Sequence, residues 1–158
     1  MKTLILYATK YGATREIAQR LAGKIEGSAI CDLKRDEIPP LGEFDCVILG
    51  SSLYAGMIRK EAKAFLSRNA DLLRGKKTGL FLSGMDPSPE QENNYFEANF
   101  SKDILQAAKT KSVLGGVFDP KKAGFMERFI MKMVAKRSEY TDTISDDKIE
   151  KFAELMMP

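Results

Sequence analysis

The stretch Tyr7-Ala8-Thr9-Lys10-Tyr11-Gly12-Ala13-Thr14 decides the fold, because it joins a strand pattern to a helix pattern. Residues 3–7 form a short apolar run, which indicates a buried strand. Beyond the stretch, apolar residues recur at helical spacing between positions 17 and 25, which indicates a helix with one buried face. The chain is therefore expected to begin with a strand, a short turn and a helix.

The turn has the composition of a phosphate-binding loop. A helix N-terminus presents unpaired N–H groups and about half a unit of positive charge, which together attract an anion. Thr9 and Thr14 add hydroxyl donors, and Gly12 lets the backbone close around a ligand. The pattern Thr9-x-x-Gly12-x-Thr14 therefore predicts a bound phosphate. The alternative is a helix capped by serine or threonine that binds nothing.

Other nucleotide motifs narrow the choice of ligand. A Walker A loop needs Gly-Lys-Ser/Thr and a dinucleotide fingerprint needs Gly-x-Gly-x-x-Gly, and neither occurs at this turn. Neutral hydroxyls and backbone N–H groups suit a terminal phosphate monoester, which has several acceptor oxygens and no second phosphate to accommodate.

The composition is that of a soluble globular protein. The 158 residues are 44% hydrophobic and 30% charged, with no tryptophan and a net charge of +3. A domain of this size buries about 70% of its extended-chain surface. No apolar run reaches the roughly 20 residues of a membrane helix, and the N-terminus leads directly into a strand instead of a signal peptide. We expect one cytoplasmic domain over residues 1–158.

The inventory of reactive side chains is small. Cys31 and Cys46 lie in separate predicted strands without metal-ligand spacing, so we interpret both as buried thiols. The chain has no histidine, which excludes Ser-His-Asp and Cys-His catalysis and histidine metal sites. We therefore predict no metal and assign no catalytic side chain. A borrowed cofactor, a lysine or tyrosine, or carboxylates remain as sources of catalysis.

Strand and helix patterns alternate along the whole chain. Strand patterns cover residues 2–7, 28–33, 45–50, 77–83 and 111–118, and helix patterns cover 13–26, 59–73, 94–108, 124–137 and 145–156. Residues 51–57 and 84–93 are predicted to be loops. The alternation predicts an α/β fold, a three-layer sandwich in which a five-stranded parallel sheet carries helices on both faces.

Two later loops, after the third and fourth predicted strands, are rich in small and polar residues. They read Ser51-Ser52-Leu53-Tyr54-Ala55-Gly56 and Ser83-Gly84-Met85-Asp86. In open α/β sheets, ligands bind beyond the carboxyl ends of the strands, where the strand order reverses. We therefore expect both loops to face the turn formed by residues 9–14, which we call the phosphate turn.

Residues 9–14 and the two later loops together resemble the short-chain flavodoxin family, over the whole chain. The resemblance implies strand order 2-1-3-4-5 and FMN, with its phosphate on Thr9–Thr14 and its ring between the later loops. It makes Tyr54 the stacking candidate, although an exposed loop tyrosine is the alternative, and makes Gly56 a position where a peptide could flip. The implied FMN site comprises Thr9, Lys10, Tyr11, Gly12, Ala13, Thr14, Ser51, Ser52, Leu53, Tyr54, Ala55, Gly56, Ser83, Gly84, Met85 and Asp86.

A narrower resemblance concerns three segments, 1–6, 126–133 and 141–143. They are similar to the flavodoxin-like, menaquinone-dependent protoporphyrinogen IX dehydrogenases of haem synthesis. That family carries an extra segment before the last helix, and residues 119–144 form such an insert here, although Phe118–Phe125 has fewer arginines and aromatic residues than the family. The resemblance implies an oxidoreductase whose partner is a quinone or a redox protein.

Charge is distributed unevenly, and it supports two different functions. The predicted helix 124–137 is amphipathic and basic, which suits an anionic membrane surface or an acidic partner, unless it simply packs on the sheet. Residues 84–100 are acidic, which suits docking to a basic redox protein and lowers a flavin reduction potential. An oxidoreductase and a soluble electron carrier therefore both stay open, with a flavin-free interaction module as a third reading. We expect no nucleic-acid partner. The basic residues of the insert are Lys121, Lys122, Arg128, Lys132, Lys136 and Arg137, and the acidic ones of the other segment are Asp86, Glu90, Glu92 and Glu97.

Overall fold

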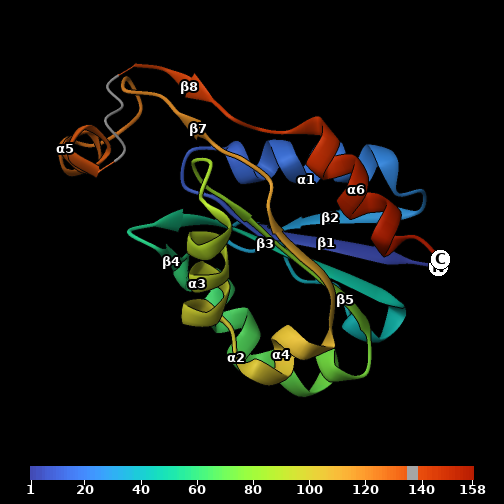
Figure 1. Ribbon diagram of the computed structural model, residues 1–158. Helices are drawn as coiled ribbons and strands as arrows, with labels where there is room; N and C mark the ends of the chain where they lie inside the picture. Colours follow the sequence, from blue (N-terminus) through green and yellow to red (C-terminus); the bar gives the residue numbers. More distant parts are fainter. Residues whose placement is uncertain (135–138) are drawn as a thin grey trace.

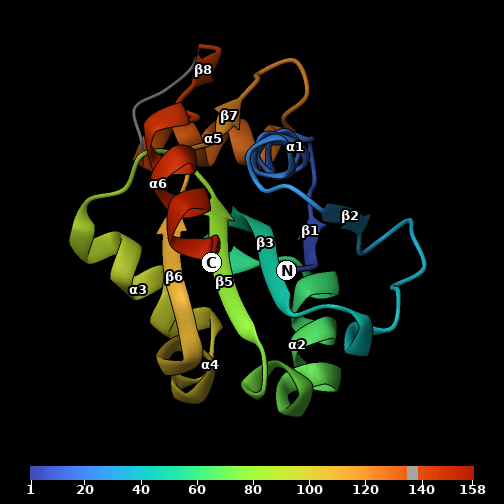
Figure 2. The same cartoon turned by 90° about the vertical axis from the view of Figure 1, so that its right-hand side faces the viewer.

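A computed structural model describes residues 1–134 and 139–158, and it contains the predicted parallel sheet. The strand order is β2-β1-β3-β5-β6, which is the predicted order 2-1-3-4-5 once the short β4 is set aside (Figure 2). The parallel strands are β1 (Thr3–Ala8), β2 (Ser28–Asp32), β3 (Cys46–Tyr54), β5 (Lys77–Ser83) and β6 (Ala108–Val113). β4 (Met57–Ile58) pairs antiparallel with the end of β3.

Helices cover both faces of the sheet, as predicted (Figure 1). On one face lie α1 (Ala13–Lys24) and α6 (Asp146–Met156). On the other lie α2 (Lys60–Arg74), α3 (Pro89–Asn99) and α4 (Lys102–Ala107), and the 3₁₀ turn η1 (Leu41–Glu43) precedes β3. The molecule is thus a three-layer sandwich, and the carboxyl ends of its parallel strands open on one edge.

The alternation of side chains along β1 divides the core into two clusters. Leu4 and Leu6 belong to the cluster that contains residues of α2, α3 and α4. Ile5 and Tyr7 belong to the cluster that contains residues of α1 and α6. Burial on both faces makes β1 a continuous apolar run, which is why the sequence pattern identified it.

Glycine permits close packing in the middle of the sheet. A Cβ at Gly50 on β3 would lie 2.0 Å from Cζ of Phe81 on the neighbouring β5. The Phe81 ring is completely buried, and its edge meets the ring of Phe152 on α6 with centroids 6.2 Å apart. The aromatic ring therefore occupies the space that any larger residue at position 50 would need.

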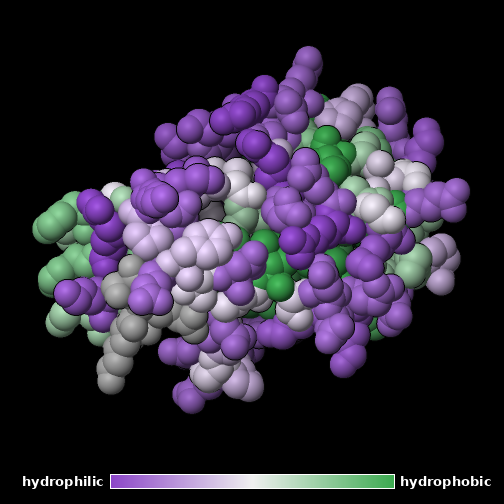
Figure 3. All heavy atoms as spheres, turned by 90° about the horizontal axis from the view of Figure 1, so that it is seen from above, coloured by the Kyte–Doolittle hydropathy of each residue, from purple (hydrophilic) through white to green (hydrophobic). Residues whose placement is uncertain are grey.

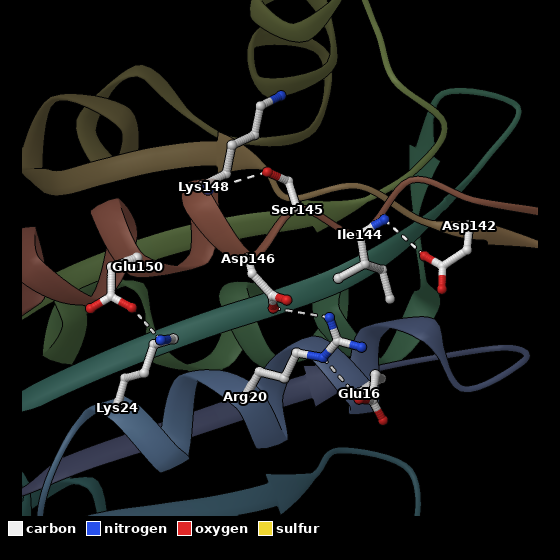
Figure 4. Close-up of polar contacts among 9 residues, drawn as sticks. All are labelled: Glu16, Arg20, Lys24, Asp142, Ile144, Ser145, Asp146, Lys148 and Glu150. Atoms are coloured by element: carbon white, nitrogen blue, oxygen red, sulfur yellow. Dashed lines mark hydrogen bonds and ion pairs between the residues drawn. The ribbon is translucent and has the colours of Figure 1, made fainter.

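The last helix is held against the first by polar contacts (Figure 4). Arg20 on α1 bonds to Glu16 at 2.9 Å and to Asp146 on α6 at 3.0 Å, and Lys24 pairs with Glu150. Ser145 caps α6 by accepting a hydrogen bond from the Lys148 N–H. Exposed ion pairs of this kind contribute at most about 1 kcal/mol each, so they orient α6 more than they stabilise it.

The insert forms a hairpin and a separate helix. β7 (Val117–Phe118) pairs with β8 (Thr141–Asp142), and α5 (Phe125–Val134) stands beside the sandwich (Figure 1). The prediction of a helix over 124–137 is confirmed for α5. Residues 135–137, including the predicted basic residues Lys136 and Arg137, lie outside the described residues.

Several predicted boundaries were wrong. Ser51–Tyr54, predicted as loop, continues β3, because these residues pair with β4 and β5. The predicted loop 84–93 contains the start of α3, since Ser88 forms a capping box with Gln91 and a proline is tolerated at the first helical position. The helix predicted over 94–108 is two helices, and the strand predicted over 111–118 is β6 at Ala108–Val113.

Both cysteines are buried, as predicted. Burial raises the pKa of the Cys31 thiol to about 11, with a smaller contribution from the nearby carboxylates of Asp36 and Asp32. Burial also raises the pKa of Cys46. Both side chains are therefore neutral thiols at physiological pH and act as small packing residues.

Candidate functional site

A cleft of about 740 Å³ lies at the carboxyl edge of the sheet. Its walls come from the β1–α1 turn, the β3–β4 hairpin, the β5–α3 loop, the start of the insert and α5. The structure thus brings the three predicted loops together around one space. All of the predicted site residues line this cleft except Gly12, Thr14 and Ser51.

Gly12 shapes the phosphate turn from outside the cleft. Its φ of +105° is in the left-handed region that favours glycine, and its N–H donates to Thr9 Oγ1 at 2.9 Å. Gly12 is the N-cap of α1, and no side chain caps the helix there. The first N–H groups of α1 therefore lack the side-chain acceptor that the alternative reading of a capped helix requires.

Thr14 is completely buried in the first turn of α1. Its hydroxyl has no hydrogen-bond partner in the part of the chain that the structure describes. A buried polar group without a partner costs about 1–3 kcal/mol, so such groups are uncommon unless a ligand or water completes them. The orphaned hydroxyl beside unpaired helix N–H groups fits a phosphate at this turn.

Ser51 is buried next to the cleft and does not line it. Its buried hydroxyl accepts a hydrogen bond from the Arg59 N–H at 2.9 Å and donates to the Ser52 carbonyl at 3.0 Å. It therefore links the two ends of the β3–β4 hairpin. The adjacent Ser52 lines the cleft, and its own hydroxyl is buried without a partner among residues 1–134 and 139–158.

The tip of the β3–β4 hairpin carries the predicted stacking residue. Tyr54 is 40% exposed, and Ala55 and Gly56 follow with φ values of +49° and +76°. Lys10 Nζ from the phosphate turn lies 4.9 Å from the Tyr54 ring centroid and 5.1 Å from that of Tyr11. A cation over an aromatic face is favourable, so this lysine bridges the turn and the hairpin.

Lys10 also connects the phosphate turn to the insert. Its ammonium forms an ion pair with Glu127 on α5, and this hydrogen bond raises the pKa of Lys10. Burial acts to raise the pKa of Glu127, but hydrogen bonds from Lys10 and Tyr11 outweigh it and leave the pKa below its ordinary value. Both groups are therefore charged at neutral pH, and α5 is held at the mouth of the cleft.

Nine residues that line the cleft were not predicted from the sequence: Arg59, Pro87, Gln91, Tyr95, Gly116, Val117, Phe118, Glu127 and Met131. Glu127 and Met131 line it from α5, and Arg59, whose Nε is buried without a partner in the described ranges, lines it from the start of α2. Glu127 had a detectable signal, because it is the single acid in the basic segment 121–134. Arg59 had none.

Asn99 at the end of α3 was also missed, although it determines the hairpin geometry. Its Nδ2 donates to the Gly56 carbonyl at 2.8 Å and its Oδ1 accepts from the Ile58 N–H at 3.0 Å. The Gly56 peptide, where the family resemblance implies a flip, is therefore held in one orientation by a side chain from another layer.

The predicted acidic surface does not gather at the cleft. Of its four acids, Asp86 lines the cleft, and it lies 3.9 Å from Lys148. Glu92 accepts the N–H of Val113 at 3.2 Å instead. The charged side chains that line the cleft are Lys10, Arg59, Asp86 and Glu127. Their charges balance, so the acidic segment gives no strong negative field at the site.

No group of three or more Cys, Asp or Glu side chains is arranged to hold a metal ion in residues 1–134 and 139–158. Among the helices of those ranges, none has the length and apolarity to cross a membrane.

The fold and the cleft define an open α/β protein with a ligand-sized cleft at the reversal of its strand order. The chain belongs to the flavodoxin domain family, because the family model described as "Flavodoxin domain" matches residues 4–145. The predicted family is thereby confirmed.

One curated relative is the protoporphyrinogen IX dehydrogenase [quinone] of Escherichia coli strain K12. It is 24% identical over 146 residues, which span 87% of this chain and 81% of the relative. Similar solved structures include a short-chain flavodoxin associated with a bacterial PDU microcompartment, with a TM-score of 0.60 and 16% identity over 99% of this chain and 97% of that one. Another is a flavoprotein from Lactobacillus acidophilus NCFM in complex with FMN, with a TM-score of 0.52 and 13% identity over 85% of this chain and 98% of that one.

Proposed function

We propose that this flavodoxin-family redox protein uses FMN to oxidise a small organic substrate and passes the electrons to a quinone or a redox protein. Family membership and the FMN complex among the similar structures support the cofactor. The E. coli relative supports a reaction of the protoporphyrinogen dehydrogenase type, as in haem synthesis. When bound, FMN supplies the electron-transfer chemistry, and the protein binds and orients it.

The cleft and the phosphate turn beside it fit FMN in size and chemistry. The phosphate turn offers the N–H groups of α1 and the orphaned Thr14 hydroxyl, which suit a phosphate monoester. Tyr54 on the hairpin and Ser83–Asp86 after β5 form the two sides where a ring would lie. The volume of about 740 Å³ is within the usual range for a cofactor or ligand site.

The placement of α5 is the single observation that favours an enzyme over an electron carrier. Glu127 and Met131 from the insert line the same cleft as the phosphate turn and the hairpin. A carrier needs an open flavin edge against which a partner protein can dock. A helix at the mouth of the cleft suits a small molecule that enters between α5 and the flavin.

The outer face of α5 supports a peripheral contact with an anionic membrane surface. Its large apolar residues are between 53% and 75% exposed, and they form the pale green group at the left of the molecule in Figure 3. Arg128 and Lys132 are exposed on the same helix. An exposed apolar face with basic neighbours is typical of a helix that lies in a membrane interface. The apolar residues are Phe125, Met126, Phe129 and Met133.

The activity is tested by reconstitution with FMN and an assay of protoporphyrinogen oxidation with menaquinone. We expect a yellow protein that oxidises this substrate. Because Met131 lines the cleft from α5, Met131→Ala should raise KM for the substrate. The FMN dissociation constant should stay unchanged. The matched control is Met133→Ala on the exposed face of the same helix. If a ferredoxin-type reductase reduces the protein but no substrate is oxidised, the chain is an electron carrier.

The membrane contact is tested by flotation with vesicles that contain anionic lipid. Phe129→Ser combined with Lys132→Gln should reduce vesicle binding by at least about fivefold, since each basic residue near such a surface contributes about 1 kcal/mol. Lys109→Gln on β6 is the matched charge control. If the wild type, the Phe129/Lys132 variant and the Lys109 control bind the vesicles equally, α5 is not a membrane contact.

A further inference from the structure

A second pocket lies on the outer side of the phosphate turn. It has a volume of about 320 Å³, and Thr9, Lys10 and Tyr11 line both this pocket and the cleft. The turn is therefore a wall that the two spaces share. The other sides of the pocket come from α1, the turn after β2 and the first turn of the insert. We call this space the basic pocket.

The lining of the basic pocket is strongly cationic. Five basic side chains and a single acidic one, Asp32, belong to it. Lys10 is already paired with Glu127, whereas Lys34 and Lys122 form no ion pair with any described residue. The pocket thus gathers five positive charges against one negative charge, and the turn after β2 and the first turn of the insert each bring a lysine without an ion pair among the described residues. The basic residues are Lys10, Arg15, Lys34, Arg35 and Lys122.

Asp32 positions two arginines without occupying their donors. The carboxylate is buried and accepts the Lys34 N–H at 2.9 Å. Its Oδ2 lies 3.9 Å from Arg15 and 4.0 Å from Arg35, which is beyond hydrogen-bond distance for both. Each guanidinium therefore keeps N–H donors for a ligand while the carboxylate holds it near the pocket.

We propose that the basic pocket binds a phosphate or carboxylate arm of the small molecule that reacts at the neighbouring cleft. Arginine pairs and lysines recognise both kinds of anion by charge-assisted hydrogen bonds. Because Lys10 and Tyr11 line both spaces, a molecule anchored here can extend across the turn toward the flavin. This inference rests on the proposed function, since it places FMN in the cleft and a second, anionic ligand beside it.

The test uses FMN-loaded protein, so that the FMN phosphate fills the turn and cannot be confused with the probe. Inorganic pyrophosphate and the dicarboxylate glutarate are titrated separately by calorimetry at physiological salt. Lys34→Ala combined with Arg35→Ala, both exposed residues, should weaken binding of the accepted probe by at least about tenfold, because charge-assisted hydrogen bonds are lost. The matched control is Lys109→Ala combined with Lys111→Ala on β6, which removes equal charge elsewhere and should leave binding unchanged.

The titrations either support the proposed anion site or overturn it. Saturable binding that only the Lys34/Arg35 variant weakens supports the proposal, and the probe that binds identifies the arm as phosphate or carboxylate. Absence of saturable binding for both probes, or equal loss in both double variants, overturns it. FMN uptake is measured independently by absorbance. If no FMN binds, the proposed function fails, and the same titrations of the flavin-free chain still decide whether the pocket is an anion site.

Discussion

The floor of the cleft and the insert beside it are built in opposite ways. The floor consists of the ends of β1, β3 and β5, whose side chains are buried between two helical layers. The insert carries α5, on which four large apolar side chains are exposed: Phe125, Met126, Phe129 and Met133. The core that stabilises the fold therefore also fixes the residues on the floor of the cleft, whereas the insert adds residues at its mouth.

The two regions are joined by few polar contacts in the described part of the chain. Lys10 and Glu127 pair across the mouth of the cleft. Next to the base of the insert, the Gly84 N–H, just after β5, donates to the Gly115 carbonyl at 3.0 Å. We therefore expect changes in the floor to cost far more stability than changes in the insert.

The largest effect is expected in the sheet itself. Gly50→Ala places a Cβ 2.0 Å from the Phe81 ring, which is buried and packed against Phe152. Overpacking at such a site should lower the free energy of unfolding by about 3 kcal/mol, measured by urea denaturation. Gly23→Ala on α1 is the control, because nothing lies within 4 Å of its added Cβ. If both variants unfold at the same urea concentration, the sheet is less tightly packed than the structure indicates.

Thr14→Val should weaken FMN binding without lowering the stability of the flavin-free protein. The substitution keeps the shape of the side chain but removes the orphaned hydroxyl, so FMN should bind more weakly by about 1–3 kcal/mol. The flavin-free protein should not lose stability, because no internal hydrogen bond is broken. Fluorescence titration of FMN measures the first effect and urea denaturation the second.

The control for this substitution is Thr3→Val, at the other end of β1 and equally buried. It should leave the FMN dissociation constant unchanged. An unchanged constant for Thr14→Val as well would remove the hydroxyl of Thr14 from the phosphate site.

Asn99→Ala should loosen the β3–β4 hairpin. The side chain donates to the Gly56 carbonyl and accepts from the Ile58 N–H, so its loss should cost about 1–2 kcal/mol of stability. It should also shift the reduction potential of bound FMN, since the Gly56 peptide becomes free to turn. Potentiometry measures the shift. Asn93→Ala, which loses only an exposed bond to Glu97, is the control and should not move the potential.

The floor of the cleft was predictable from the sequence because the patterns that identify it lie within short, continuous stretches of the chain. Residues 4–6 are aliphatic, as expected of a strand buried on both faces, and the turn at Thr9–Thr14 follows shortly after. The alternation of strands and helices then determines the parallel sheet and places three loops at one edge. Ser51 was misplaced because a run of small residues reads as loop, although pairing with β5 keeps it extended.

The contacts that complete the site were not predictable, because they depend on tertiary structure. Asn99 is 43 residues along the chain from Gly56, whose carbonyl it binds. Arg59 is close in sequence to the hairpin, but only the fold shows that its side chain lines the cleft. The Lys10–Glu127 pair joins positions 117 residues apart. The exposed apolar face of α5 was visible as a helical pattern, but the pattern alone did not distinguish packing on the sheet from exposure.

The smallest effect is expected at the link between the two regions. Glu127→Gln removes an ion pair with a partly exposed lysine, so it should lower the free energy of unfolding at pH 7 by at most about 1 kcal/mol. The pKa of Glu127 lies below its ordinary 4.5 in the folded protein, so the pair stabilises above that pH and is lost as the pH falls through the lower value. The difference between wild type and variant should therefore vanish on acidification, while Glu139→Gln, an exposed acid of the same insert, should show no difference at either pH. A difference that persisted in acid would show that shape and not charge holds α5 to the phosphate turn.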